Sequence, residues 1–376
     1  MTRLVAWRIL THQKGRSALA IAGIFVAVLM IFLQLGFYSS VPKGGMLVYD
    51  RMRFDLVLAS SAYYFQGQSF DLPRRRLYQA RALPEVASAA PIYQGEAQWL
   101  NLKTNLRRDI FVMAFNLRDT VFDVPDIVRQ RDLLDRPDVV LVDQATRPMF
   151  GPLTAGGHVE INDRDVEIVG SYDLGMGFAG LGVVTTSDLN FVRIFPNRAL
   201  SEVNLGLITL RPGSDPDRAA RRLRALLPAD TRVFTRAEFA DHEIIHWVAA
   251  TSTGLVFGFG AAISVVVGTI ILYQILSTQI RHQLPQYAVL KAIGYRDRDL
   301  GEIVVTLAAT MAAIAYVPAV AAALVIYRLV RGMTLLPIDM TGGRLAAVLL
   351  IALAMSTGSA AASVRGLRRA DPVDLF

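Results

Sequence analysis

The sequence predicts a membrane protein with four transmembrane α-helices and a large α+β domain inserted between helices 1 and 2. Of the 376 residues, 53% are hydrophobic and only 19% are charged, and the mean hydropathy is +0.38. Four stretches of at least 20 residues contain no Asp, Glu, Lys or Arg. A helix needs about 20 apolar residues to cross ~30 Å of hydrocarbon. Helices of soluble proteins average about 10–14 residues, so buried soluble helices do not account for these stretches.

We assign the transmembrane helices to residues 17–42, 247–276, 303–327 and 345–364. The first stretch follows a basic segment, as a signal peptide does, but its apolar run is too long and no convincing cleavage site ends it. We therefore interpret it as an uncleaved anchor. The second charge-free stretch is longer than one span, and we place its membrane part near residues 253–276.

The distribution of basic residues predicts the orientation. Residues 1–16 carry four Lys or Arg and no acidic residue, which places them in the cytoplasm by the positive-inside rule. Four crossings then put the loop 277–302 and the tail 365–376 in the cytoplasm, and the domain 43–246 and the short loop 328–344 outside. The short loop carries Arg328, Arg331 and Arg344, which is contrary to the rule. The basic residues of the other three segments all support this orientation, so we keep it.

The net charge of +7 does not indicate a nucleic-acid-binding protein. Residues 43–246 hold 25 Lys or Arg against 26 Asp or Glu, so the basic surplus lies in the membrane flanks, where it faces anionic lipid. A nucleic-acid-binding protein would carry the basic cluster on its soluble module. The chain also has no Cys, which excludes disulfides, Cys-zinc sites and iron–sulfur clusters.

Two strand–helix–strand units of similar order are expected to frame the external domain. We predict strands at residues 54–59, 86–93, 205–210 and 232–235, and helices at residues 72–82 and 218–227, the latter with Asp215 as its N-cap. Between the two units we expect a mostly β insert, with strands at residues 109–115, 139–142, 158–161, 166–171 and 182–185.

Four segments resemble a known family: Thr253–Gly260 (TGLVFGFG), Val267–Gln274 (VGTIILYQ), Leu284–Tyr295 (LPQYAVLKAIGY) and Leu367–Leu375 (LRRADPVDL). They are similar to DevC-type permeases, a branch of the FtsX/MacB superfamily of ABC exporters. The order of one span, a large periplasmic domain and three spans matches as well, so the resemblance covers essentially the whole chain. Gln286 stands where the family is expected to have an acidic residue, which alters a possible charge contact with the ATPase.

The resemblance implies a permease subunit of a bacterial tripartite exporter in the inner membrane. Such a subunit forms a dimer, here expected to be a homodimer. It binds a separate cytoplasmic ABC ATPase and a periplasmic membrane fusion protein, and through the latter a TolC-like outer-membrane channel. It transmits motion from the ATPase to the periplasmic domain. The chain contains no Gly-x4-Gly-Lys-Ser/Thr P-loop, so we expect no ATPase activity of its own and no cofactor.

The cytoplasmic loop is expected to contact the ATPase. Pro285 suits the first turn of a short helix and Gly294 suits its end. The expected contact residues, including these two, are Leu284, Pro285, Tyr287, Leu290, Lys291, Gly294 and Tyr295. Such an amphipathic helix docks in a partner's groove or lies on lipid, and we favour docking. Separately, Gly254 and Gly258 form a GxxxG pair that permits close helix packing.

Two other functions remain open. His242, Glu243 and His246 form an HExxH motif, which on a helix could bind zinc in a metallopeptidase. No third ligand is within reach in the sequence, so we predict no metal site. The simpler interpretation is a stalk helix with its His and Glu in solvent and Trp247 at the membrane interface. An FtsX-like regulator of cell-wall hydrolases would share the same topology.

Overall fold

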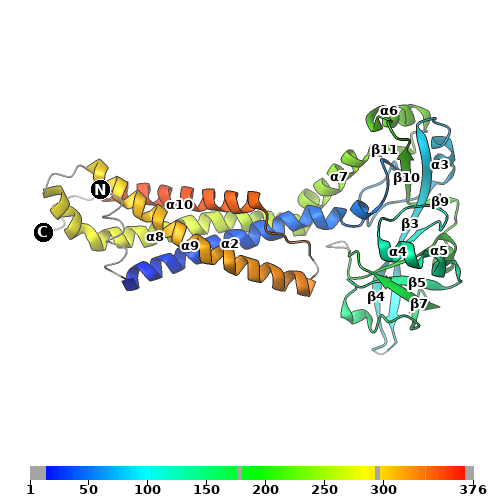
Figure 1. The fold of residues 1–376 in the computed structure, drawn as a ribbon, viewed down its shortest axis with the longest axis horizontal. Coiled ribbons are helices and arrows are strands. Elements are labelled where there is room, and N and C mark those ends of the chain that lie inside the picture. Colours follow the sequence, from blue (N-terminus) through cyan, green and yellow to red (C-terminus); the bar gives the residue numbers. More distant parts are fainter. Residues whose placement is uncertain (1–13, 103, 176–179, 293–296, 335, 369–376) are drawn as a thin grey trace. The chain divides into compact units, whose positions relative to one another are not determined.

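The computed structural model describes residues 14–102, 104–175, 180–292, 297–334 and 336–368 (Figure 1). The chain divides into two compact units, each with its own hydrophobic core. The helical unit comprises Met1–Ser40, Ser252–Thr334 and Ile338–Phe376, and the sheet unit comprises Val41–Thr251 and Leu335–Pro337.

Long helices build the helical unit. They are α2 (Lys14–Met46), α8 (Ser252–Ala292), α9 (Asp297–Thr334) and α10 (Gly342–Arg368). Within the described residues, four stretches are long and apolar enough to cross a membrane: Ser17–Met46, Ser252–His282, Gly301–Gly332 and Gly342–Val364. The predicted architecture, with one such helix before the inserted domain and three after it, is confirmed.

Small residues let these helices approach closely. Helix α9 presents a row of fully buried alanines, spaced three or four residues apart: Ala308, Ala312, Ala315, Ala319 and Ala323. Such a spacing keeps the alanines on one face of the helix. On α2, a Cβ added to Gly23 would lie 2.5 Å from Cδ1 of Ile275 on α8. Packing of small residues is the usual basis of helix association in a membrane.

The helices differ in several bounds from the expected ranges, and three of these differences have a clear structural reason. Helix α2 passes Pro42 and ends at Met46, because Met46 is buried in the core of the sheet unit and tertiary packing holds the last turn. Helix α8 begins at Ser252 rather than at residue 247, because residues 246–250 form a π-helix and Thr251 is extended. Helix α8 also continues through Pro285 to Ala292, so the expected separate helix beginning at Pro285 is wrong. No glycine interrupts the sequence between Gly268 and Gly294, and a single proline removes only one backbone hydrogen bond.

The sheet unit holds a nine-stranded sheet. Its strands are β1 (Leu56–Ser60), β3 (Val86–Asn101), β4 (Leu106–Phe115), β5 (Val139–Asp143), β6 (His158–Ile161), β7 (Arg164–Tyr172), β8 (Val183–Ser187), β10 (Leu205–Leu210) and β11 (Thr231–Thr235). Their order is β11-β1-β10-β3-β4-β8-β5-β7-β6, and β3 also pairs with β6. A separate two-stranded sheet joins β2 (Leu72–Pro73) and β9 (Glu202–Val203).

The two predicted strand–helix–strand units form the frame. They are β1–α3–β3, with α3 at Arg75–Ala80, and β10–α6–β11, with α6 at Pro216–Leu226. Their four strands lie side by side in the order β11-β1-β10-β3, all antiparallel, so the two units interlock as a split βαβ arrangement. The predicted N-cap is confirmed, because the Asp215 side chain accepts a hydrogen bond from the Asp217 N–H at 3.0 Å.

The predicted β insert is present, but it shares the sheet of the frame. Strand β3 continues to Asn101, eight residues beyond its expected end, and pairs with β4 along ten positions. Strands β4 and β8 are parallel, as are β5 and β7, while β5 and β8 are antiparallel. The insert adds the short helices α4 (Pro125–Gln130) and α5 (Asp188–Ile194).

Both faces of the sheet are covered. Along β1, Leu56 and Leu58 enter one core with Leu77 of α3 and Leu223 of α6. Val57 and Ala59 enter the opposite core, together with Phe239 of α7 (Arg236–Ile245). Successive residues of a strand point to opposite faces, which explains why all five residues of β1 are buried. Helix α7, which leads towards α8 in the chain, therefore lies against the second core.

Candidate functional site

The predicted ATPase-contact residues fall at the end of α8. Leu284, Pro285, Tyr287, Leu290 and Lys291 belong to the backbone of this helix, which ends at Ala292. Gly294 and Tyr295 lie outside the described residues. The contact residues before Ala292 thus continue the helix of the second apolar span rather than forming a detached element. The contact itself stays a prediction.

The GxxxG pair lies in the first turns of α8. A Cβ added to Gly258 would lie 3.3 Å from Cε2 of Tyr38, which belongs to α2 of the same helical unit. A Cβ added to a further glycine, Gly260, would lie 2.5 Å from Oε1 of Gln34 on α2. This end of α8 therefore packs closely on α2. Gly254 lies one turn before Gly258 on the same helix.

The HExxH motif occupies the last turns of α7. This helix begins with a capping box: Oγ1 of Thr235 accepts the Glu238 N–H at 3.2 Å, and Oε2 of Glu238 accepts the Thr235 N–H at 2.8 Å. Helix α7 is followed directly by the π-helix η4 (His246–Ala250). The capping box fixes the start of α7, and with it the direction in which Glu243 points.

Glu243 is fully buried, with an exposed fraction of 0%. Its Oε1 accepts a hydrogen bond from the Tyr63 hydroxyl at 2.6 Å, and its Oε2 accepts one from the Gln66 N–H at 3.4 Å. Burial raises the pKa of Glu243 to about 7, and the donors Tyr63 and Gln66, with the nearby Trp247, offset this only in part. In the described part of the chain no cationic side chain forms an ion pair with it.

Both histidines of the motif are engaged by the loop after β1. Nε2 of His242 lies 2.9 Å from the Tyr64 carbonyl oxygen; a carbonyl only accepts, so this nitrogen carries the proton. The ring of His246 stacks on Phe65, with centroids 4.2 Å apart and planes at 12°. Burial and, second, the nearby His242 lower the pKa of His246.

This geometry does not fit a zinc site. The Nε2 atom of His242 donates a hydrogen bond, so it has no lone pair for a metal, and both oxygens of Glu243 accept hydrogen bonds. Among the described residues, no group of three His, Cys, Asp or Glu side chains could hold a metal ion. The expectation that Glu243 and His246 are solvated is wrong, because they are 0% and 8% exposed.

Trp247 is also buried within its own chain, and its position at a membrane interface stays a prediction. Its exposed fraction is 7%, and it packs edge-on against Phe65 at 6.0 Å. A Cβ added to Gly45, in the last turn of α2, would clash with Cδ1 of Trp247. Only glycine permits this approach. We call Tyr63, Phe65, Gln66, Glu243, His246 and Trp247 the Glu243 cluster.

One signal in the sequence indicates this burial. Phe239, Glu243 and Trp247 are spaced four residues apart, which places Glu243 between two large aromatic residues on one helix face. Phe239 is fully buried among Tyr49 and Phe54, with centroids 4.8 Å and 6.3 Å away, both edge-on. A Glu between two aromatic residues on one helix face indicates that its carboxyl group is buried. The charged and histidine residues next to it in the sequence favour a solvent-exposed interpretation instead.

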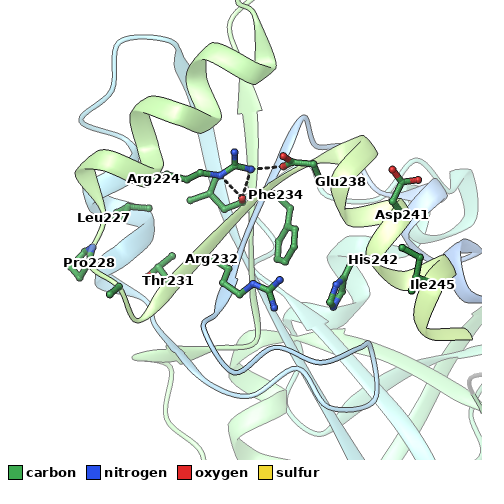
Figure 2. Close-up of a pocket in the computed structure, with 12 residues that line it drawn as sticks. Arg224, Leu227, Pro228, Thr231, Arg232, Phe234, Glu238, Asp241, His242 and Ile245 are labelled. Atoms are coloured by element: carbon green, nitrogen blue, oxygen red, sulfur yellow. Dashed lines mark hydrogen bonds and ion pairs between the residues drawn. The ribbon is translucent and has the colours of Figure 1, made fainter. Parts of the chain in front are cut away.

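A pocket of about 610 Å³ lies between α6, β11 and α7 (Figure 2). Two charged residues of its lining form an ion pair, and Figure 2 shows Arg224 reaching Glu238. Nε and Nη2 of Arg224 also donate to the Val233 carbonyl oxygen at 3.0 Å and 2.8 Å. The guanidinium of Arg232 lies 4.7 Å above the Phe234 ring and donates to the Tyr63 carbonyl at 3.2 Å. The arginines thus fasten α6, β11 and the loop after β1 together.

Comparisons with known proteins give two family matches. Residues 17–226 match the MacB-like periplasmic core domain, and residues 258–372 match the FtsX-like permease C-terminal region. No curated protein matches the chain.

Three solved structures are similar to part of the chain. The periplasmic region of MacB from Actinobacillus actinomycetemcomitans is 10% identical, with a TM-score of 0.36, over 52% of this chain and 92% of that one. The extracellular domain of the noncanonic ABC-type transporter YknZ from Gram-positive bacteria is 11% identical, with a TM-score of 0.33, over 48% and 99%. A permease-protein domain from Porphyromonas gingivalis is 15% identical, with a TM-score of 0.32, over 49% and 87%.

Proposed function

The chain belongs to the family with a MacB-like periplasmic core domain, and from this membership we propose that it is the mechanotransmitting permease subunit of a bacterial tripartite ABC exporter. The family is a transmembrane component of ABC transporters and is not itself catalytic. In our proposal a separate cytoplasmic ATPase supplies the energy, a membrane fusion protein binds the periplasmic domain, and a TolC-like channel completes the path. The chain lies in the inner membrane with both termini in the cytoplasm.

One observation carries the proposal. A single chain joins the periplasmic core domain, residues 17–226, to the FtsX-like permease region, residues 258–372, and contains no P-loop. A protein with both parts has a domain outside the membrane to be moved and spans that carry the motion. We propose that the energy comes from another subunit.

The backbone of the chain supports transmission of motion. Helix α8 runs without interruption from Ser252 to Ala292, so the proposed ATPase-contact residues and the second apolar span share one helix. Only Thr251 separates α8 from η4, which itself follows α7 directly. A displacement at the cytoplasmic end of α8 would therefore be delivered to the point where α7 is anchored by Phe239 and Glu243.

We further propose a homodimer formed through α8. This span is the least covered by its own chain, with 11% of its most apolar window buried against 28–33% in the other three. Its outward residues recur every three or four positions and are large and apolar: Val256, Phe259, Ile263, Val266 and Ile270. A second copy packed on this stripe would cover it, while the basic flanks of the spans meet anionic lipid.

The variant Leu290→Asp in the full-length chain tests the ATPase contact. Buried apolar anchors dominate interface energies, with about 2 kcal/mol or more lost on truncation, and an unpaired buried carboxylate adds a further penalty. We expect the variant to lose copurification with the ATPase and to lose export. His282→Asp, an exposed position earlier on α8, introduces the same charge and should retain both.

The competing function is distinguished by the periplasmic partner. A regulator of cell-wall hydrolases would bind a coiled-coil activator in place of a membrane fusion protein. Stable expression of Leu290→Asp with unchanged ATPase binding would remove this end of α8 from the mechanism. Both functions are compatible with ATPase binding by the unaltered chain, so the periplasmic partner decides. A coiled-coil activator on the periplasmic domain, with no fusion protein, would favour the regulator.

A further inference from the structure

We propose that Glu243 is a proton-binding switch in the segment formed by α7 and η4. When Glu243 is protonated, this segment packs against the last turn of α2, and when Glu243 is ionised, this packing is weakened. The proposal is independent of the identity of the exported cargo. It rests on the geometry of the Glu243 cluster, on the π-helix that follows it, and on the contact between Gly45 and Trp247.

The cluster is built for a neutral carboxyl group. An ionised carboxylate offers about four acceptor positions, but Glu243 receives one short hydrogen bond, from Tyr63, and one long one, from the Gln66 N–H. Burying a charge without a counter-ion is costly. Around it, four further buried polar atoms have no hydrogen-bond partner: Nε2 of Gln66, Nδ1 of His246, Nε1 of Trp247 and the Tyr49 hydroxyl oxygen. A site this poorly supplied favours the form without charge.

The charged and titratable groups packed around Glu243 do not form an ion pair with it. Arg232 and Arg236 donate to the backbone carbonyl oxygens of Tyr63 and Tyr49. Among the residues that the structure describes, no ion pair joins either arginine to Glu243. Tyr49 faces it from the turn after α2 and Tyr63 from the loop after β1, and burial raises the pKa of both hydroxyls above the usual range, so both stay neutral. On its own helix, His246 has its pKa lowered by burial and by His242, and His242 is hydrogen-bonded to the Tyr64 carbonyl.

The segment after Glu243 departs from regular α-helix. The π-helix η4 occupies His246–Ala250, and π-helical turns within α-helices are rare and concentrate at functional sites. Within η4, Trp247 meets Gly45 of α2 so closely that no Cβ would fit. Trp247 is also one helical turn from Glu243, so loss of the Glu243 hydrogen bonds removes the neighbouring support of the Trp247 contact.

The direction of the pH effect follows from burial. The pKa of Glu243 lies at about 7 when packed, against 4.5 when solvated, so the packed form binds the proton more tightly. Because proton binding and packing are linked, α7 and η4 open more easily as the pH rises, and this effect levels off above the pKa that Glu243 has when packed. The whole difference between the two pKa values corresponds to an about 300-fold change in the equilibrium constant for opening of α7 and η4. About tenfold of this change falls between pH 6 and pH 8.

Hydrogen exchange of the full-length chain in nanodiscs tests this. Protection factors, which are normalised for the pH dependence of unprotected exchange, should fall about tenfold in α7 and η4 between pH 6 and pH 8. Glu243→Gln keeps the shape and removes the titration, so its protection should be independent of pH. Asp241→Asn, at an exposed position of the same helix, should behave as the unaltered chain.

A second measurement starts from the unaltered chain, and this part of it does not depend on any variant folding. Infrared difference spectra of the unaltered chain should show a buried carboxyl group that titrates near neutral pH, and Tyr63→Phe should move its midpoint upward because a donor to the charged form is lost. Protection of α7 that is unchanged from pH 6 to pH 8, or a tenfold change that persists in Glu243→Gln, would overturn the switch. A chelator that abolishes the effect would identify a metal rather than a proton as its origin.

Discussion

Truncation of Phe239 should detach α7 from the sheet unit without unfolding that unit. Only two residues of α7 are fully buried, Phe239 and Glu243. The Phe239 ring lies 4.8 Å from Tyr49 and 5.8 Å from Phe234, both near edge-on. Replacing a buried Phe with Ala costs about 3–5 kcal/mol through lost transfer energy and the remaining cavity. Because Phe239 is one of the two buried side chains of α7, we expect most of this cost to appear as local opening of α7.

The assay is amide exchange of the full-length Phe239→Ala variant. A loss of about 3 kcal/mol corresponds to about 150-fold lower protection in α7. Amides of β10, between β1 and β3 in the sheet, should change far less. Tyr78→Ala removes an aromatic ring that is 58% exposed on α3 and should alter protection of α7 by less than about threefold. Equal loss in α7 and β10, or no loss in α7, would refute the view that Phe239 is the local anchor.

Two further predictions use the absence of cysteine in the chain, which leaves a clean background for single substitutions. Ser201→Cys and His282→Cys, both at exposed positions, should react with a membrane-impermeant thiol reagent from opposite sides, the former from the periplasm; labelling of both from one side would contradict the four-span topology. Val256→Cys on α8 should form a disulfide-linked dimer under mild oxidation, whereas Leu350→Cys on α10, equally exposed, should not; cross-linking through Leu350 alone would move the dimer contact away from α8.

The parts of the fold that depend on local patterns could be predicted from the sequence. Charge-free stretches identify the four apolar helices because a long run without ionisable side chains is typical of a membrane span and rare in the helices of soluble proteins. Strand β10 has the predicted bounds, and α6 has the predicted cap at Asp215, since caps and strand alternation are local properties. Strand β3 shows the limit: its extension to Asn101 depends on pairing with β4, and pairing between strands is not a local property.

The candidate site was harder to predict, because its key property is burial produced by a loop distant in sequence. The acidic and histidine residues around Glu243 are typical of a solvated or metal-binding helix. Residues 63–66, which are more than 170 positions earlier, turn the same residues into a closed cluster. The spacing of Phe239, Glu243 and Trp247 on one helix face indicates burial, but it becomes convincing only once the loop that covers this face is known.

The break between η4 and α8 determines how motion can reach the sheet unit. Thr251 is extended, with φ −95° and ψ 148°, so the backbone hydrogen bonds of α8 do not continue into η4. A helix cannot transmit bending across such a break by its backbone alone. In the proposed mechanism, motion that comes from α8 therefore depends on side chains of η4, whose buried residues are His246 and Trp247, whereas α2 runs from Lys14 to Met46 without such a break. Trp247 rests on Gly45, and Glu243 lies one turn before it. In the proposed mechanism, the stiffness of the connection between α8 and η4 therefore depends on whether the Glu243 cluster is closed.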